Sequence, residues 1–187
     1  MGQRAFTLIE LIVVIAIIAI LAAVIAPNAF RAIEKAKVSH ITEDAKVIKT
    51  AAYAMFGDTG LWPGSNWGDD SATDALAPAA QGEGFVFKGN NVNMSDSWDG
   101  PYIDKWPFNP WGGQYWWDYN FADQNGDGIG QEHVLWIDNG QGNAGKRIPQ
   151  SARLKIDQTL DDGNLSSGRI QVWQGTNLGY ILIQGEG

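Results

Sequence analysis

The sequence predicts an α+β fold: a long N-terminal α-helix, membrane-spanning in its first half, with an antiparallel β-sheet head packed on its second half. Three observations support this prediction. Residues 11–30 form an uncharged apolar run. Apolar residues then recur at helical spacing as far as about Phe56. Short strand-like segments follow, separated by sequence rich in Gly, Asn and Asp, which favours antiparallel pairing.

The uncharged run Leu11–Phe30 is long enough to cross a membrane, because twenty helical residues span roughly 30 Å. The alternative is a cleaved secretory signal, cut near Ala26 or Ala29. The apolar region of such a signal is usually shorter and does not begin with a carboxylate, whereas Glu10 stands directly before this run. We therefore expect a membrane anchor, with the head on the outer side of the membrane.

The start of the run resembles the signature of type IV prepilins. Phe6-Thr7-Leu8-Ile9-Glu10 is followed by the apolar segment Leu11–Ala23, a pattern that type IV pilins share with the pseudopilins of type II secretion. The resemblance implies that a prepilin peptidase cuts between Ala5 and Phe6 and methylates the new amine. Residues 1–5 would then be a leader peptide. The family usually has Gly before the cut, where this chain has Ala5.

The same resemblance implies a structural subunit of a helical filament built from copies of the chain. Residues 6–30 would be the transmembrane and assembly helix, residues 31–56 its amphipathic continuation and residues 57–187 the globular head. Pro27 lies where many family members carry a helix-bending proline. The implied partners are the prepilin peptidase, an inner-membrane assembly platform, minor pilins and, before assembly, membrane lipid.

Glu10 is the residue to which the signature gives a role in assembly. A charged group at the edge of the membrane is costly unless it is paired, so it is a functional hypothesis. Cleavage would place the amine of Phe6 four residues before Glu10, and in a stack of staggered helices this carboxylate can meet a neighbour's amine. The alternative is a glutamate that reaches the membrane surface and pairs with nothing.

The second half of the helix shows one mostly apolar stripe, which suits packing against a sheet. Gly57 is the expected stop, which gives a helix of about 75 Å from Phe6 to about Phe56. Pro27 removes a backbone hydrogen bond, so we expect a kink or local melting there. The stripe consists of Ile33, Lys37, Ile41, Ala45, Ile48, Ala52 and Met55.

The head is predicted to contain five strands and one short helix. A helix is expected over Ser151–Leu160, where three apolar residues share one helical face. Residues 58–63 and 98–112 resemble the helix exit and the loop before the sheet in the major pseudopilin of type II secretion. Residues after about Gly140 extend beyond that pattern. The strands are expected at 85–87, 114–119, 133–137, 169–173 and 180–184.

A candidate calcium loop begins at Asp123. Asp123, Asn125 and Asp127 offer oxygen ligands at alternate positions, as in the first half of an EF-hand loop, and the backbone carbonyl of Ile129 would follow. The resemblance to major pseudopilins, which bind calcium in this region, supports a Ca²⁺ cofactor. A hairpin turn is the alternative, because Asn-Gly and Asp-Gly favour turns.

The second half of this loop departs from the EF-hand rule. Val134 stands where the bidentate glutamate belongs, so Glu132, Asp118 or Asp138 would have to complete the shell. A second acidic stretch, Asp161–Asn164, is a weaker calcium candidate, and a simple turn is the favoured interpretation there.

Charge and composition exclude several function classes. The net charge of −8 disfavours direct nucleic-acid binding, and with it a DNA-uptake pilin. The absence of cysteine excludes disulfides and thiolate chemistry. His40 and His133 are isolated, and no nucleophile elbow, paired glutamates or zinc spacing occur, so an enzyme is not expected. The nine tryptophans are interpreted as core and interface residues rather than as a sugar-stacking surface.

Two functions follow from this reasoning. The first is a pseudopilus subunit of type II secretion, which moves proteins across the outer membrane. The second is a surface type IV pilin for adhesion or motility. Both predict a single-pass inner-membrane precursor that becomes part of an extracytoplasmic filament.

Overall fold

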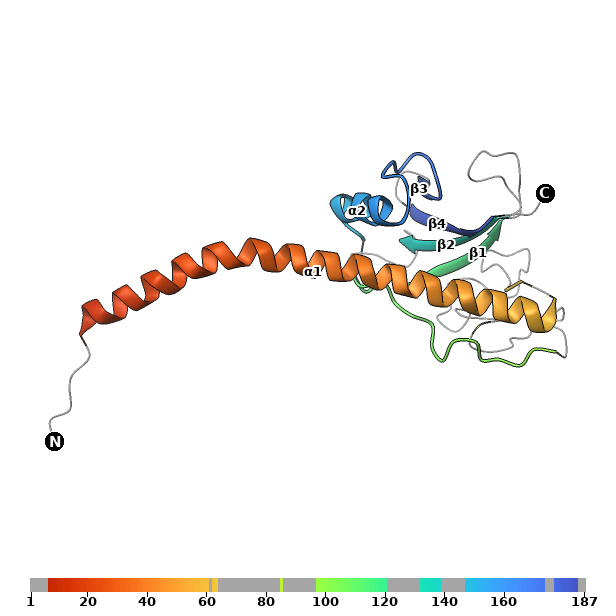
Figure 1. Cartoon of the computed structure of the whole chain (residues 1–187), viewed down its shortest axis with the longest axis horizontal. Helices are drawn as coiled ribbons and strands as arrows, with labels where there is room; N and C mark the ends of the chain where they lie inside the picture. The colour runs from red at the N-terminus through yellow and green to blue at the C-terminus, as the bar shows by residue number, and fades with distance from the viewer. Residues whose placement is uncertain are drawn as a thin grey trace, which may run out of the picture. The chain divides into compact units, whose positions relative to one another are not determined.

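The computed structural model describes residues 7–60, 62–63, 85, 97–120, 132–138, 147–173 and 177–184. The chain forms two compact units, Met1–Lys37 and Val38–Gly187, and α1 runs through both. The α+β prediction is confirmed. The elements are α1 (Leu8–Thr59), β1 (Trp116–Asn120), β2 (Glu132–Asp138), α2 (Gln150–Leu160), β3 (Ile170–Trp173) and β4 (Asn177–Ile183) (Figure 1).

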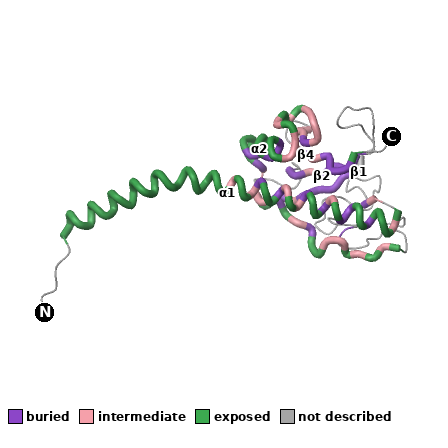
Figure 2. Tube along the Cα trace, viewed as in Figure 1, coloured by how far each residue is buried: buried purple, intermediate pink, exposed green. Residues whose placement is uncertain are grey.

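The C-terminal half of α1 buries one stripe in the core of the second unit. Five of the seven predicted stripe positions are buried there, whereas Ile33 is 54% exposed and Lys37 is only partly buried. Figure 2 shows buried and exposed residues alternating along this half of the helix. The period of 3.6 residues thus predicted the packed face correctly. The buried residues are Val38, Ile41, Ala45, Ile48, Ala51, Ala52 and Met55.

The predicted stop at Gly57 is wrong, because α1 continues to Thr59. Gly60 ends the helix instead: its φ is +68°, and its N–H donates to the carbonyl of Phe56 at 2.8 Å. The Thr59 hydroxyl also donates to the carbonyl of Met55 at 2.7 Å. A glycine in this left-handed conformation is a frequent helix terminator, since other residues are strained there. Gly57 has helical neighbours on both sides and no such role.

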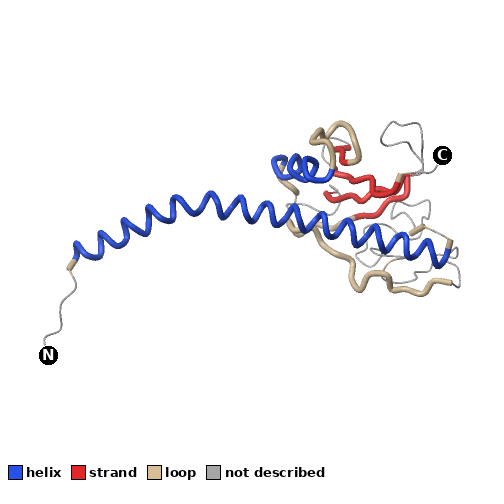
Figure 3. Tube along the Cα trace, in the orientation of Figure 1, coloured by secondary structure: helices blue, strands red, loops and turns tan. Residues whose placement is uncertain are grey.

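The head contains a four-stranded antiparallel sheet with the order β1-β2-β4-β3. Figure 3 shows the strands of the head in red. Strands β2 and β4 lie in the middle, and both are buried along most of their length. Four of the five predicted strands are confirmed, with ends shifted by up to three residues. For the fifth, only Phe85 lies among the described residues; it is buried in a turn, and its carbonyl accepts the N–H groups of Tyr102 and Ile103.

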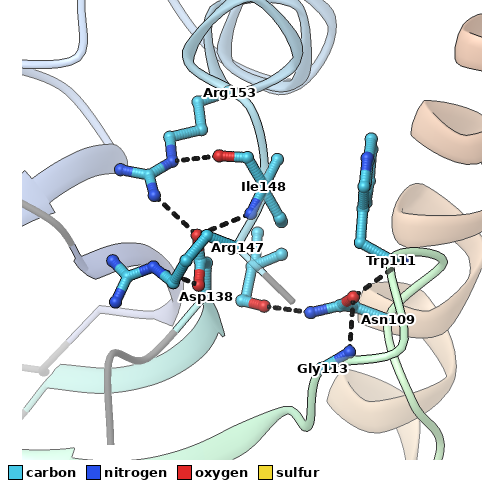
Figure 4. A network of polar contacts seen from close by, with 8 residues as sticks. Asn109, Trp111, Gly113, Asp138, Arg147, Ile148 and Arg153 are labelled. Atoms are coloured by element: carbon cyan, nitrogen blue, oxygen red, sulfur yellow. Dashed lines mark hydrogen bonds and ion pairs between the residues drawn. The ribbon is translucent and has the colours of Figure 1, made fainter. Parts of the chain in front are cut away.

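Helix α2 confirms the prediction for Ser151–Leu160 and begins one residue earlier. It is held near the sheet by a buried carboxylate at the end of β2 (Figure 4). The two carboxylate oxygens of Asp138, which is fully buried, lie 3.1 Å from Nε of Arg147 and 2.7 Å from a terminal nitrogen of Arg153. The N–H of Ile148 donates to the same carboxylate at 2.9 Å. This network joins the end of β2 to residues 147–148 and to α2.

A second polar centre shown in Figure 4 holds the segment before β1 against the sheet. The side-chain amide of Asn109 donates to the carbonyl of Ile137 at 2.8 Å. Its carbonyl oxygen accepts the N–H groups of Trp111 and Gly113 at 2.9 and 3.1 Å. Asn109 is buried, and its amide nitrogen and its carbonyl oxygen both bond to backbone groups, which positions this segment.

All the tryptophans within the described ranges are buried or partly buried. Trp106, Trp116 and Trp117 are buried, and the other five within the described ranges are partly buried. The indole N–H of Trp117 donates to the carbonyl of Pro63 at 3.1 Å. The ring of His133 packs against Trp117, and burial lowers the pKa of this histidine to about 4, so it is neutral at physiological pH. The interpretation of the tryptophans as core residues agrees with these positions.

Candidate assembly helix

The first half of α1 exposes apolar side chains on all its faces. Every described residue from Thr7 to Ala32 is exposed, with large apolar side chains between 47% and 76% accessible (Figure 2). Among the described residues, α1 is the helix that is long and apolar enough to cross a membrane. A helix that is apolar all round needs lipid or other helices around it. The segment is therefore consistent with a single-pass membrane anchor.

The helix begins with a reciprocal cap made by two residues of the signature. The N–H of Glu10 donates to the hydroxyl of Thr7 at 3.3 Å, and the N–H of Thr7 donates to the Glu10 carboxylate at 2.9 Å. The Thr7 hydroxyl also donates to that carboxylate at 2.6 Å. This arrangement is a capping box, which satisfies two of the backbone donors that every helix start leaves free.

The capping box gives the Glu10 carboxylate a hydrogen-bond partner within its own chain. The carboxylate is exposed at the first turn and accepts two hydrogen bonds from Thr7. Oxygens of a carboxylate have further lone pairs, so the same group can also accept a bond from a neighbouring amine. Sequence reasoning missed the role of Thr7, although a threonine followed three residues later by glutamate before an apolar run is the usual pattern of such a cap.

The helix continues through Pro27 without interruption. The helix therefore does not melt locally at Pro27, which was one of the two effects expected of this proline. The helix tolerates the lost hydrogen bond because the turns on both sides remain helical. The processing residues Ala5 and Phe6 lie outside the described residues.

The predicted calcium ligands are mostly outside the described residues, namely Asp123, Asn125, Asp127 and Ile129. Glu132 is the first residue of β2 and is 1% exposed. The register pairs Glu132 with Asn120, so the last residue of β1 and the first residue of β2 lie side by side in the sheet.

The alternative ligand Asp138 lies far from Glu132. Asp138 lies at the other end of β2 from Glu132, about 20 Å away along the strand. Its carboxylate is engaged by Arg147 and Arg153. Asp118 is buried in β1 and accepts the indole N–H of Trp136 at 3.3 Å.

Two protein families match parts of the chain. Residues 1–26 match the family described as "Prokaryotic N-terminal methylation motif". Residues 32–128, which are 97 of the 187 residues, match the family described as "PilW, C-terminal". No curated protein and no solved structure gave a significant match.

These matches agree with the capped, apolar helix at the start of the chain and confirm the resemblance to prepilins. The methylation motif covers the predicted cut between Ala5 and Phe6 and most of the anchor. Both families consist of structural proteins, so the chain is a pilin-like structural subunit and not an enzyme. The chain belongs to the type IV pilin-like prepilins, within the family described as PilW, C-terminal.

Proposed function

We propose that the chain polymerises through α1 into a type IV pilin-like filament. The observation that carries the proposal is the apolar surface of residues 8–30, exposed on all faces and capped by a single carboxylate. Before assembly this surface would be covered by membrane lipid, and in the filament by the α1 helices of neighbouring subunits. Glu10 would then pair with the amine of an adjacent subunit and set the axial register.

The test is the composition of filaments sheared from cells that produce the full-length chain together with a prepilin peptidase and an assembly platform. We expect filaments in which the processed chain is a repeating subunit, visible by electron microscopy and by gel analysis. Recovery of the chain only from the membrane fraction, in cells whose other pilins assemble, would contradict the proposal. The same fractionation reports whether the head faces the periplasm or the exterior, through its accessibility to added protease.

Two observations favour different roles within such filaments. A pseudopilus that moves proteins across the outer membrane is supported by the likeness of residues 58–63 and 98–112 to the major pseudopilin. These segments meet in the head, where the Tyr102 hydroxyl donates to Asp58 at 2.9 Å. The match to PilW, C-terminal instead favours a minor pilin-like role in a surface pilus. A count of copies per filament separates a main subunit from a minor one, and secretion and motility assays of a deletion strain separate the systems.

Processing is expected to remove residues 1–5 and to leave a methylated Phe6 as the N-terminus. The motif match and the carboxylate at the first helical turn motivate this prediction. Intact-mass analysis of the mature protein measures it directly, with the protein from a strain without prepilin peptidase as the control. Retention of Met1, or a cut near Ala26, would show that the N-terminal segment is handled by a different pathway.

Calcium is expected to stabilise the head through the loop that joins β1 and β2. Asp123, Asn125 and Asp127 can converge only if a cation offsets the repulsion between the two carboxylates. At 100 times its dissociation constant, calcium would add about 2.7 kcal/mol to the free energy of unfolding. Asp127→Ala should reduce the rise in melting temperature that calcium gives the full-length protein in micelles, whereas the exposed Asp104→Ala should keep all of that rise. Equal melting temperatures of the wild type in calcium and in chelator would contradict this prediction.

A further inference from the structure

Three carboxylates meet at the C-terminal end of α2. Asp157 belongs to the last turn of the helix, and Asp161 and Asp162 follow directly after it. One oxygen atom of each residue can be chosen so that all three lie within 4.8 Å of one another. Asp157 and Asp161 are separated by four residues, the spacing that brings side chains to one side of a helical turn.

Asp157 is buried without compensation. Its side chain is 0% exposed, and within the described part of the chain neither carboxylate oxygen has a hydrogen-bond partner of normal geometry. Burial raises its pKa to about 6, and the charges of Asp162 and Asp161 act in the same direction, although the nearby N–H of Gly163 opposes them. A buried carboxylate in this setting is costly unless a positive charge joins it.

The end of the helix adds to the negative potential at this place. The last turn of α2, residues 157–160, contains no basic side chain. The carbonyl groups at a helix C-terminus point outward without partners, and the helix dipole is negative there. A positive charge would be stabilising at this end of the helix, but the chain places three carboxylates there.

The loop after α2 holds the other two carboxylates in place. Asp161 accepts the N–H groups of Arg169 and Ile170, the latter at 3.0 Å. A side chain at Gly168, whose φ is +79°, would overlap the Asp161 carboxylate. The carboxylate therefore has a defined position close to the backbone.

Asp162 is fixed by two further hydrogen bonds. The N–H of Asn164 donates to one oxygen at 2.7 Å, and the hydroxyl of Ser167 donates to the other at 3.0 Å. Each carboxylate oxygen that accepts one such bond keeps a lone pair for a metal ion. The repulsion among the three groups is thus built into the fold rather than relieved by movement of exposed side chains.

We propose that Asp157, Asp161 and Asp162 bind a hard divalent cation, for which calcium is the best fit. Calcium takes oxygen ligands at about 2.3–2.6 Å in a flexible geometry, so three carboxylate oxygens that all lie within 4.8 Å of one another can share one ion. Magnesium demands a near-ideal octahedron with ligands at about 2.0–2.1 Å and retains its water more strongly, so it suits a cluster of three fixed carboxylates less well. Water would complete the calcium shell on the exposed side, where Asp162 lies.

The bound cation would tie the end of α2 to the loop that leads into β3. Asp157 belongs to the helix and Asp162 to the loop, while Asp161 already holds the first residue of β3 through the N–H of Ile170. A single ion would thereby join three successive parts of the head, and its removal would loosen this corner. The role is separate from assembly through α1.

The proposal can be tested by calcium titration calorimetry of the full-length protein in detergent micelles. An Asp127→Ala background removes a ligand of the loop between β1 and β2, so that the α2 cluster is measured by itself. We expect one calcium per chain in this background, and an affinity at least about tenfold lower after Asp157→Asn or Asp162→Asn. Asp104→Asn, which replaces an exposed carboxylate outside the cluster, should bind calcium with the same affinity as the background. Magnesium is expected to bind more weakly than calcium.

Thermal melts distinguish loss of the site from loss of the fold. In chelator, Asp157→Asn should melt at or above the temperature of its background, since asparagine has the same shape and carries no buried charge. In calcium, the background should gain stability and Asp157→Asn should gain none. Asp162→Asn changes an exposed residue and tests the same site without altering the core. Calcium binding that is unchanged in both variants, or no heat of binding in the background up to millimolar calcium, would overturn the proposal.

Discussion

Replacing Glu10 with alanine is expected to leave the protein in the membrane and to block its assembly into filaments. The substitution makes insertion easier because it removes a charge, and it leaves the amine of a neighbouring subunit unpaired. Removing one partner of a buried ion pair costs about 3–5 kcal/mol, which is more than a hundredfold in an equilibrium constant for each contact. The measurement is the yield of sheared filaments relative to the amount of processed subunit in the membrane.

The capping box provides the controls that separate charge from helix capping. Glu10→Gln keeps a side chain that can cap the helix start but removes the charge. Thr7→Ala keeps the charge but removes the hydroxyl that bonds to it at 2.6 Å, at a cost of about 1 kcal/mol for a lost cap. If the charge sets the register, the glutamine variant should fail like alanine, and Thr7→Ala should still form filaments at reduced yield.

Two outcomes would contradict this role of the carboxylate. Filaments at normal yield from Glu10→Ala would show that register is set elsewhere. Normal yield from Glu10→Gln together with failure of Thr7→Ala would show that the residue acts only as a helix cap. Intact-mass analysis of each variant is required as well, so that a defect in processing is not mistaken for a defect in assembly.

Local periodicity was sufficient to predict most of the fold. The apolar stripe of α1 repeats over several turns, so its packed face was found from Ile41, Ala45 and Ile48 alone. Strands β2 and β4 were found because short β-branched and aromatic runs between turn residues are typical of strands. Both signals are local, and the structure of each element agrees with its own sequence.

What the sequence could not predict depends on contacts between distant residues. The choice of Gly60 over Gly57 as the helix terminator depends on which glycine takes a positive φ, and both are possible from sequence. The strand order follows from the long-range register of β2 and β4, for which no local signal exists. The same is true of the ion pairs of Asp138, whose partners Arg147 and Arg153 come later in the chain, the second of them in α2.

The candidate sites also divide into features with a local sequence signal and features that depend on tertiary contacts. Glu10 was predicted from its place in the motif, but the cap that Thr7 makes was overlooked although its pattern is local. At the end of α2, the pair Asp161 and Asp162 was noticed as an acidic turn. Asp157 was missed because a helical aspartate four residues earlier looks like a solvated residue, and its burial is set by the tertiary structure.

Asp138→Ala is expected to destabilise the head strongly. Asp138 is 0% exposed and receives three partners, so alanine leaves Arg147, Arg153 and the N–H of Ile148 without their acceptor. Arg153 is the more buried arginine, with 12% of its side chain exposed, and suffers the larger desolvation cost. Breaking such a buried pair costs about 3–5 kcal/mol, which lowers the melting temperature of a head of this size by at least about 6 °C.

The measurement is a thermal melt of the full-length protein in detergent micelles, followed by near-ultraviolet circular dichroism because tryptophans lie in the core. Chelator is present throughout, so that loss of a metal ion does not contribute. Asp104→Ala, which removes an exposed carboxylate, should melt within about 1 °C of the wild type. Asp138→Asn should fall between the two, since its amide oxygen can still accept the N–H of Ile148 but carries no charge for the arginines. A melting temperature of Asp138→Ala equal to that of Asp104→Ala would mean that α2 is held to β2 by its apolar contacts alone.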